Sequence, residues 1–317
     1  MRSNWASEVT QETLILRDNL LGKIRNFFCE RRVLEVTTPT IGIAGASDPH
    51  LENLTLNLGS QLGYMQTSPE YAMKRLVAGG SGPIYQICPA YRGGESGEHH
   101  NIEFTMLEWY RPEYSLQELI FELQELLHAV CALRFKVISY GEAFQQFCNI
   151  NVHGASLEDL KALICQKGLD YSHLLGNVDI SDYLDLIFST VIERHLEATI
   201  VTDFPACQAA LAETKSNSEG ELVASRFECF LGGIELANGY FELRDTDEIL
   251  NRLGQNNLYR RRNDLPQVPI DEMAVTAMGE LNPCSGVAVG IDRLVMYLSG
   301  ETNITRVINF AGDHRSD

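Results

Sequence analysis

Paired cysteines are missing from this chain of 317 residues: its eight cysteines are scattered, with no CxxC pair and no Cys/His metal spacing. A disulfide-stapled scaffold and a zinc-ribbon site are thereby excluded, and we expect buried thiols in a reducing compartment. No apolar run approaches the about 20 residues that span a bilayer, no charged-then-apolar leader opens the sequence, and no internal repeat is present. These absences favour a cytoplasmic protein without membrane association.

Basic residues are also scarce, with 25 lysines and arginines against 43 acidic residues and a formal net charge of -18. That charge would repel a polyanion such as tRNA unless a local basic patch intervened. The only dense basic cluster, Arg260 to Arg262, is small, and we interpret it as a solvated helix end. We therefore do not expect tRNA as a partner, whereas an acidic surface suits a partner protein that presents a lysine.

Two segments carry residues suited to holding a nucleotide. In the first, residues 83–111, apolar strands flank a polar, glycine-containing loop and predict a long hairpin. Arg92 at the loop entry can neutralise a phosphate, because a guanidinium is always charged and forks onto paired oxygens. Phe104 at the loop exit can lie flat against a purine. Taken alone, this segment is better explained by an ordinary surface hairpin with a solvated loop.

The second segment is GVAVGIDRLVMYL, residues 286–298, which predicts a strand leading into an apolar helix. Gly286, Ala288 and Gly290 leave one face of the strand nearly bare, so that a ligand can approach the backbone. Arg293, just past the strand end, is placed to cover the other face of a purine. A glycine-rich strand packed against a helix, with Arg293 on the surface, is the alternative for this segment alone.

Together these segments resemble motifs two and three of the class II aminoacyl-tRNA synthetases, with detail of the lysyl branch. Four further stretches match the family in order. RRVLEVTTPTI (31–41, with Pro39) resembles motif one. TSPEYAMKRL (67–76), HNIEFTMLEWY (100–110) and GIELANGYFEL (233–243) resemble segments of the lysyl enzymes. The resemblance implies an α+β catalytic domain in which helices flank an antiparallel sheet. It also implies a homodimer formed through motif one and the helix before it.

The domain organisation narrows the resemblance further. Apolar spacing between residues 16 and 27 predicts that the helix before motif one begins near residue 11, and we therefore expect no anticodon-binding domain. We expect a single catalytic domain over residues 1–317 with a helical insertion at about 142–200, where helices start near Ser156 and Ser181. Ser115 with Glu118 predicts a capping box before another helix. The chain thus resembles the elongation factor P–lysine ligase family, truncated lysyl-type paralogues that modify a protein in place of a tRNA.

Strand geometry relates the carboxylates of residues 226–243. If Gly232 and Gly233 form a two-residue turn, Glu228 lies opposite Ala237, and Glu235 shares its face. Such paired carboxylates repel unless a cation lies between them, and their oxygens suit Mg²⁺ bridging ATP phosphates. An exposed acidic strand face is the alternative. The next carboxylate, Glu242, should face away from Glu235 unless a bulge at residues 238–239 restores the alternation.

The resemblance implies specific roles for individual residues. Phe104 and Arg293 would sandwich adenine, Arg92 would stabilise the reacting phosphate, and Glu228 and Glu235 would bind Mg²⁺. The ATP-binding positions of the family match Arg92, Gly93, Gly94, Asn101, Phe104, Glu235, Leu236, Gly290 and Arg293. The amino-acid-binding positions match Gly45, Ser68, Pro69, Glu70, Glu108, Tyr110, Glu242 and Ala288. Glu70 and Glu242 would face the side-chain amine of a lysine, and a neutral analogue would leave both unpaired.

The reaction implied by the resemblance is activation of lysine by ATP as an aminoacyl-adenylate, followed by transfer to a lysine of elongation factor P. Arg92 and Arg293 would be the catalytic arginines. The chain departs from the family in two places. The hairpin pattern of arginine, any residue, glutamate is broken by Gly94, although Glu95 could reach the site if the glycines bend the loop. Ala288 stands where true lysyl enzymes usually have glycine, and its methyl group would favour (R)-β-lysine.

Three alternative functions remain open from the sequence. A minimal lysyl-tRNA synthetase would need a basic docking surface for tRNA. A truncated asparagine synthetase would need a basic residue for the second carboxylate of aspartate, and Glu70 and Glu242 argue against it. A non-catalytic amino-acid sensor would keep the pocket and lose turnover through Gly94.

Overall fold

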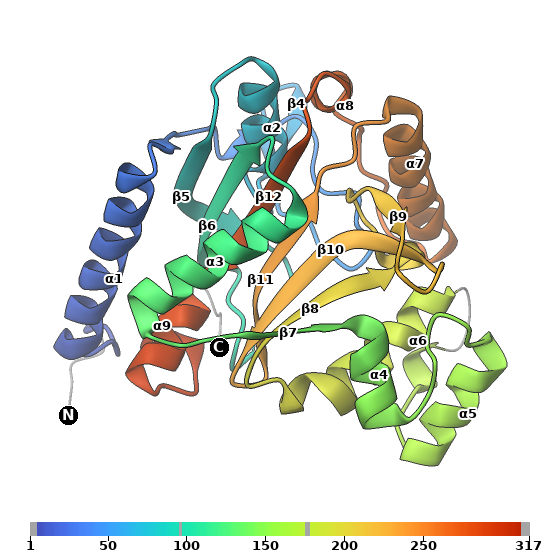
Figure 1. Ribbon diagram of the computed structural model, residues 1–317. Coiled ribbons are helices and arrows are strands. Elements are labelled where there is room, and N and C mark those ends of the chain that lie inside the picture. The colour runs from blue at the N-terminus through green and yellow to red at the C-terminus, as the bar shows by residue number, and fades with distance from the viewer. Residues whose placement is uncertain (1–4, 95–96, 175–177, 312–317) are drawn as a thin grey trace.

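A computed structural model describes residues 5–94, 97–174 and 178–311, and its centre is a mostly antiparallel sheet covered by helices (Figure 1). In spatial order the sheet contains β1 (Leu34–Glu35), β5 (Ile84–Tyr91), β6 (Glu103–Pro112), β12 (Cys284–Gly290), β11 (Ile234–Phe241), β10 (Leu222–Leu231), β8 (Ala198–Pro205) and β7 (Lys136–Ser139), and β9 (Thr214–Ser216) pairs with β10. The β1–β5 and β7–β8 pairs are parallel, and the remaining pairs are antiparallel. The predicted α+β class is confirmed.

A smaller antiparallel sheet lies beside the central one, in the order β2 (Ile41–Gly42), β4 (Gln61–Met65) and β3 (Thr55–Leu58). The helices are α1 (Gln11–Glu30), α2 (Glu70–Ala78), α3 (Leu116–Cys131), α4 (Tyr140–Cys148), α5 (Leu157–Lys167), α6 (Ile180–Ile187), α7 (Thr246–Arg262), α8 (Glu272–Gly279) and α9 (Ile291–Ser299). A π turn, Phe188–Ile192, and a 3-10 turn, Glu193–His195, continue α6 toward β8. None of the described helices combines the length and hydrophobicity needed to cross a bilayer.

Three hydrophobic clusters hold these layers together. The largest joins α1, α3 and α9 to one face of the sheet, around the fully buried Trp109 and Phe28. A second cluster joins α4, α5 and α6, which lie in the segment where we expected a helical insertion, to β8 and β10 of the sheet (Figure 1). The third joins α2, α7 and α8 to the sheet near β12. The division into a catalytic domain with an insertion stays a prediction.

Local sequence signals predicted several element boundaries. Ser115 and Glu118 form the expected capping box, in which the Glu118 backbone N–H donates to Ser115 Oγ and the Glu118 carboxylate accepts from the Ser115 backbone. Ser156 caps α5 in the same way, and α6 begins at Ile180 with Asp179 as its cap. In each case neighbouring residues in the chain satisfy the unpaired N–H groups of a helix end.

The β10–β11 hairpin corrects the expected register. Gly232 and Gly233 do form a two-residue turn, both with positive φ, as a type I′ turn requires. However, Glu228 pairs with Asn238 and not with Ala237, because β11 has one extra residue, Leu236, at a bulge. Leu236 and Ala237 both bury their side chains in the largest core cluster.

The bulge also corrects the predicted orientation of Glu242. We expected it to face away from Glu235 unless a bulge lay at residues 238–239. A bulge two positions earlier has the same effect on the alternation, so Glu228, Glu235 and Glu242 all line one cavity.

Two further expectations were wrong in part, since Arg261 and Arg262 are exposed at the end of α7 but Arg260 is not. Arg260 is not part of a solvated helix end: it is buried, and its guanidinium donates to the carbonyls of Pro266, Asp48 and Leu51. It therefore fixes the 48–51 loop against the end of α7. The cysteines are all free, but they are not uniformly buried, because Cys29, Cys165 and Cys207 are exposed.

Candidate active site

A cavity of about 1120 Å³ lies over the face of the sheet formed by β6, β12, β11 and β10. The sheet forms one wall, and α6, α7 and the 46–51 loop contribute the others. The predicted site residues that line it are Ser68, Glu70, Arg92, Glu108, Tyr110, Glu228, Glu235, Glu242 and Ala288. The remaining predicted residues lie outside its described lining, and these are Gly45, Pro69, Gly93, Gly94, Asn101, Phe104, Leu236, Gly290 and Arg293.

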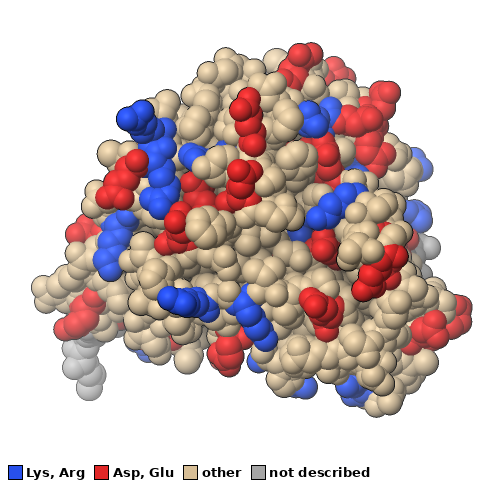
Figure 2. Space-filling view, viewed as in Figure 1, with Lys and Arg blue, Asp and Glu red and all other residues tan. Residues whose placement is uncertain are grey.

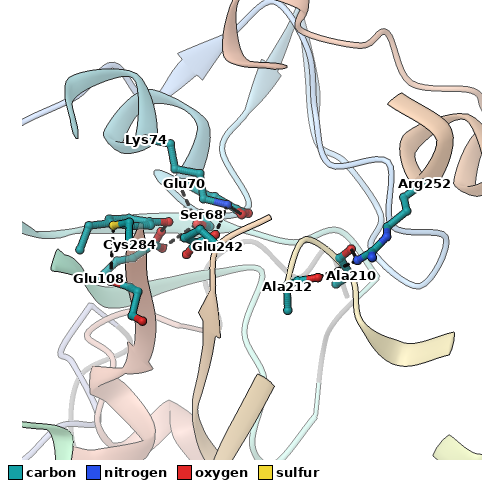
Figure 3. Close-up of polar contacts among 11 residues, drawn as sticks. Ser68, Glu70, Lys74, Glu108, Ala210, Ala212, Glu242, Arg252 and Cys284 are labelled. Atoms are coloured by element: carbon teal, nitrogen blue, oxygen red, sulfur yellow. Dashed lines mark hydrogen bonds and ion pairs between the residues drawn. The ribbon is translucent and has the colours of Figure 1, made fainter. Parts of the chain in front are cut away.

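One end of the cavity contains an ion-pair triad in which Lys74 and Glu242 are buried and Glu70 is partly exposed (Figure 3). Lys74 Nζ lies 2.6 Å from Glu70 Oε1 and 2.5 Å from Glu242 Oε2, so that this ammonium bridges the two carboxylates. Lys74 is 0% exposed and Glu242 only 1%. Burial disfavours the charged form of Lys74, but the adjacent Glu242 and Glu70 more than offset it and raise its pKa. The two carboxylates expected to hold a substrate amine thus already share an internal cation.

Glu108 forms a second polar group beside this triad. Its carboxylate accepts hydrogen bonds from the Ser68 hydroxyl at 2.6 Å and from the Tyr110 hydroxyl at 2.7 Å. Burial, followed by the negative charge of Glu70, raises the pKa of Glu108 to about 7. Burial likewise raises the pKa of Glu242 to about 7, although Lys74 opposes the shift. This end of the cavity therefore holds three carboxylates against one lysine.

The carboxylates of the β10–β11 hairpin line another part of the cavity. Arg226 forms an ion pair with Glu228, and Asn238 Nδ2 donates to Glu228 Oε1 at 3.3 Å. Burial raises the pKa of Glu228 to about 8, with Arg226 acting in the opposite direction. The Oδ1 atom of Asn238 is buried without a hydrogen-bond partner among the described residues.

These oxygens fit a hard divalent cation in their chemistry. The carboxylates of Glu228 and Glu235 and the unpartnered Asn238 Oδ1 are the ligand types that Mg²⁺ prefers. The described residues do not include a group of three or more Asp, Glu, His or Cys side chains already placed around a metal position. A metal here would therefore take its remaining ligands from phosphate and water.

The expected nucleotide residues form two contact pairs. The Arg92 guanidinium lies over the Phe104 ring at 5.2 Å from its centroid. Arg293 Nη1 donates to the Glu235 carbonyl at 2.6 Å, and its Nε contacts the His99 carbonyl at 3.5 Å, so this side chain joins α9 to β11 and to the hairpin loop. Asn101 is buried and donates to the Glu103 carbonyl at 2.6 Å, within the same hairpin.

Comparison with known proteins decides the family. The sequence model of the tRNA synthetases class II (D, K and N) matches residues 3–314. This chain belongs to that family. It is 41% identical over 319 residues to the elongation factor P–(R)-beta-lysine ligase of Pseudoalteromonas translucida (strain TAC 125), covering 96% of this chain and 97% of that protein. It is 40% identical over 323 residues to proteins of the same name from Salmonella dublin and Salmonella paratyphi B, with 98% of each chain covered.

Glu52 lies against Gly94, the residue that breaks the class II hairpin pattern of arginine, any residue, glutamate. Gly94 has a φ of +69°, and a Cβ there would lie 2.8 Å from Glu52 Oε2. The Gly93 N–H also donates to the Glu52 carbonyl at 2.8 Å. The side chain of Glu52 therefore occupies the space beside the two glycines. Glu95, which we expected could replace the missing carboxylate, lies outside the described residues.

Neighbouring side chains leave no room for a larger residue on one face of β12, the class II motif-three strand. A Cβ on Gly286 would approach Tyr110 Cε1 to 2.4 Å and Glu242 Oε1 to 2.7 Å, so only glycine fits there. Ala288 pairs with Asn238 on one side and with Glu108 on the other. Its methyl group therefore lies between the part of the cavity that contains the triad and the part that contains Glu228.

The remaining amino-acid positions have close local contacts. Ser68 Oγ accepts from the Glu70 N–H at 3.0 Å, and Pro69 precedes the first residue of α2. A Cβ on Gly45 would lie 2.1 Å from Asn53 Oδ1, so this position also requires glycine.

Sequence reasoning missed four residues of this class II site, and two of them, Arg226 and Asn238, contact Glu228. Lys74 lies one helical turn after Glu70 on α2, a spacing that brings their side chains together, and that i,i+4 pattern was a usable signal. Glu193 lines the cavity from the 3-10 turn after α6, and its Oε1 accepts from the Glu235 backbone N–H at 3.3 Å. Burial and the nearby Glu235 raise the pKa of Glu193 to about 7. No motif surrounds Glu193, so only the fold could place it.

Proposed function

We propose that this chain activates lysine, preferably (R)-β-lysine, with ATP and transfers it to a lysine side chain of elongation factor P. The names of its relatives support the acceptor and the substrate, and membership of the class II family supports the use of ATP. The observation that carries the proposal is that Glu70, Glu108 and Glu242 line the same cavity as Arg92. Three carboxylates against Lys74 leave negative charge for a substrate ammonium, while an arginine suits phosphate.

The reaction proceeds in two balanced steps. In the first, a carboxylate oxygen of the amino acid bonds to the α-phosphorus of ATP, and the bond from that phosphorus to pyrophosphate breaks. In the second, the acceptor amine bonds to the activated carbonyl carbon, AMP leaves, and the amine loses a proton. Arg92 and Arg293 hold the phosphate and adenine ends of the nucleotide, so positioning and charge stabilisation supply the catalysis.

The proposal also gives the other predicted residues roles in binding the nucleotide. Glu228, Glu235 and the Asn238 amide oxygen would hold Mg²⁺, which when bound neutralises phosphate charge. Phe104 offers a flat apolar surface to adenine, and the backbone at Glu235 and Leu236 lies beside Arg293. Asn101 shapes the hairpin, through its bond to Glu103, and does so from outside the cavity.

The substrate preference follows from Ala288. Its side chain lies between Glu108 and Asn238 on the cavity wall, where a glycine would leave more room. A methyl group at this point disfavours a substituent on the α-carbon, and moving the amine to the β-carbon avoids the conflict. Gly45 and Pro69 would support the same pocket from the loop and from the start of α2.

We further propose a cytoplasmic homodimer that does not bind tRNA. The helix α1 exposes Leu14 and Ile15, and the short strand β1 exposes Leu34, which supports an interface there. On the face shown in Figure 2, lysine and arginine side chains are interspersed with acidic ones and do not form a broad basic surface. A net charge of -18 opposes tRNA binding for the same reason.

The decisive experiment combines the chain with ATP, Mg²⁺, one lysine isomer and elongation factor P, and measures the acceptor by mass spectrometry. An added lysyl mass, with faster pyrophosphate exchange for (R)-β-lysine than for α-lysine, is the expected result. Charging of tRNA in a parallel reaction would instead establish a minimal lysyl-tRNA synthetase. Lysine binding without pyrophosphate exchange would establish a sensor and overturn the proposal.

A further inference from the structure

The residues next to Phe104 and Arg293 in the chain are hydrogen-bonded to each other. Thr105 follows Phe104 on β6, and Asp292 precedes Arg293 at the start of α9. The Thr105 backbone N–H donates to Asp292 Oδ2 at 2.5 Å. Asp292 is only 2% exposed, so this bond is shielded from water. The segments that carry Phe104 and Arg293 are therefore joined directly by the residues next to them.

A third residue, Arg17 of α1, contacts both segments. Its Nη1 lies 2.5 Å from Asp292 Oδ1, and its Nη2 donates to Thr105 Oγ1 at 2.6 Å. The two nitrogens of one rigid, planar guanidinium thus contact both segments at once. Because Asp292 uses one oxygen for Arg17 and the other for Thr105, the three residues form a closed set of charge-assisted contacts.

The strand ladder alone does not determine the spacing at this point. The last pair of the β12–β6 ladder is Gly290 with Met106, after which one chain turns into α9 while β6 continues to Thr105 and Phe104. Beyond that pair, contacts of Arg17, Asp292 and Thr105 link the start of α9 to β6. The helices α1 and α9 also pack against each other (Figure 1), and this packing keeps the helix that carries Arg17 next to α9.

We propose that Arg17, Asp292 and Thr105 form a clamp that sets the separation between Phe104 and Arg293 and thereby the affinity for the adenine ring. These are positioning residues, because they act on the nucleotide through their neighbours. The inference rests on the proposed function only in placing adenine between Phe104 and Arg293. It assigns to α1 a role in nucleotide recognition in addition to packing.

The test compares ATP with inorganic tripolyphosphate, which has the phosphates and lacks the adenine. Binding of each to the full chain, with Mg²⁺ and without lysine, is measured by calorimetry for Arg17→Met and Thr105→Val. We expect each variant to weaken ATP binding by about tenfold, the size of one lost charged hydrogen bond, while the Kd for tripolyphosphate changes less than twofold. The two penalties should be less than additive in the double variant, because both break one set of contacts.

Matched variants separate positioning from folding. Arg25→Met removes another α1 arginine, one that pairs with the exposed Glu35, and serves as the control for losing a guanidinium from this helix. Thr105→Ser keeps the hydroxyl and should lose less ATP affinity than Thr105→Val. Thermal unfolding of each variant shows whether it is folded, and Thr105→Val is the milder change if Arg17→Met unfolds.

Three outcomes would overturn the clamp: equal weakening of ATP and tripolyphosphate, unchanged ATP binding, or a wild-type chain that binds both ligands equally. Since lysine and elongation factor P are absent, failure of the lysine ligase proposal would be seen in other experiments and would leave this result readable.

Discussion

Lys74 Nζ lies 2.5 Å from Glu242 Oε2, and neither side chain is exposed by more than 1%. A buried pair of this kind contributes little net stability, but removing one partner leaves an uncompensated charge. Lys74 also contacts Glu70, so a single internal cation holds both carboxylates beside the cavity. The pocket for a substrate amine is therefore organised by a lysine of the protein itself.

Replacement of Lys74 tests this arrangement. Lys74→Met should lower the free energy of unfolding by about 3–5 kcal/mol, because Glu242 becomes a buried carboxylate without its cation. The double variant Lys74→Met/Glu242→Gln should recover much of that loss, since both charges are removed together. Chemical denaturation measures both values, and additive losses would show that the two residues do not act as a pair.

The pH dependence of lysine activation follows from Glu108 and Glu242. Burial raises the pKa of each to about 7, so both lose their charge as the pH falls below that value. A neutral carboxyl group no longer attracts an ammonium, whereas the substrate amine stays protonated throughout. We expect the KM for lysine in pyrophosphate exchange to rise by about tenfold per titrating group from pH 8 to pH 6.

A matched variant identifies the group responsible for this titration. Glu108→Gln keeps hydrogen bonding to Ser68 and Tyr110 possible but cannot titrate, so its KM should be higher at pH 8 and vary less with pH. An unchanged pH profile in this variant would exclude Glu108 as a titrating group in binding.

Ala288 is the position expected to distinguish the lysine isomers. Ala288→Gly removes the methyl group between Glu108 and Asn238 and should raise kcat/KM for α-lysine relative to (R)-β-lysine by about tenfold or more, the range for one methyl group. Pyrophosphate exchange with each isomer measures the ratio. Ala288→Ser, which adds bulk, is the control and should not shift the ratio toward α-lysine. An isomer ratio that stays constant in Ala288→Gly would place the selectivity elsewhere.

Because Glu52 lies against Gly94, the effect of substituting Gly94 on stability should depend on the side chain at position 52. Gly94→Ala should be destabilising by about 1–2 kcal/mol, because φ is +69° and the new Cβ would meet Glu52 Oε2. In a Glu52→Ala background the steric part of this penalty should disappear, leaving the backbone part. Unfolding free energies of the two single variants and the double variant give the comparison. Equal penalties in both backgrounds would show that Glu52 moves aside at no cost.

Signals that depend on a few consecutive residues were predictable from the sequence. The Ser115 and Ser156 caps, the Gly232–Gly233 turn and the bare face at Gly286 each follow from the backbone or the side chains of nearby residues. The resemblance in motif order predicted the α+β fold in the same way, because each matched segment is short and continuous. The cavity-lining carboxylates Glu70, Glu108, Glu235 and Glu242 belong to these segments.

Only the tertiary structure decided which distant site residues contact one another and how burial shifts their pKa values. The Leu236 bulge exists because Leu236 and Ala237 both enter the core, and that packing moved Glu242 to the cavity face. Arg260 became buried and Glu193 came to contact Glu235 through contacts across long stretches of chain. The sequence by itself thus determined the local elements and the residue types of the site. Burial and distant neighbours, which no short pattern contains, determined the charges, the register and the pairing of Lys74 with Glu242.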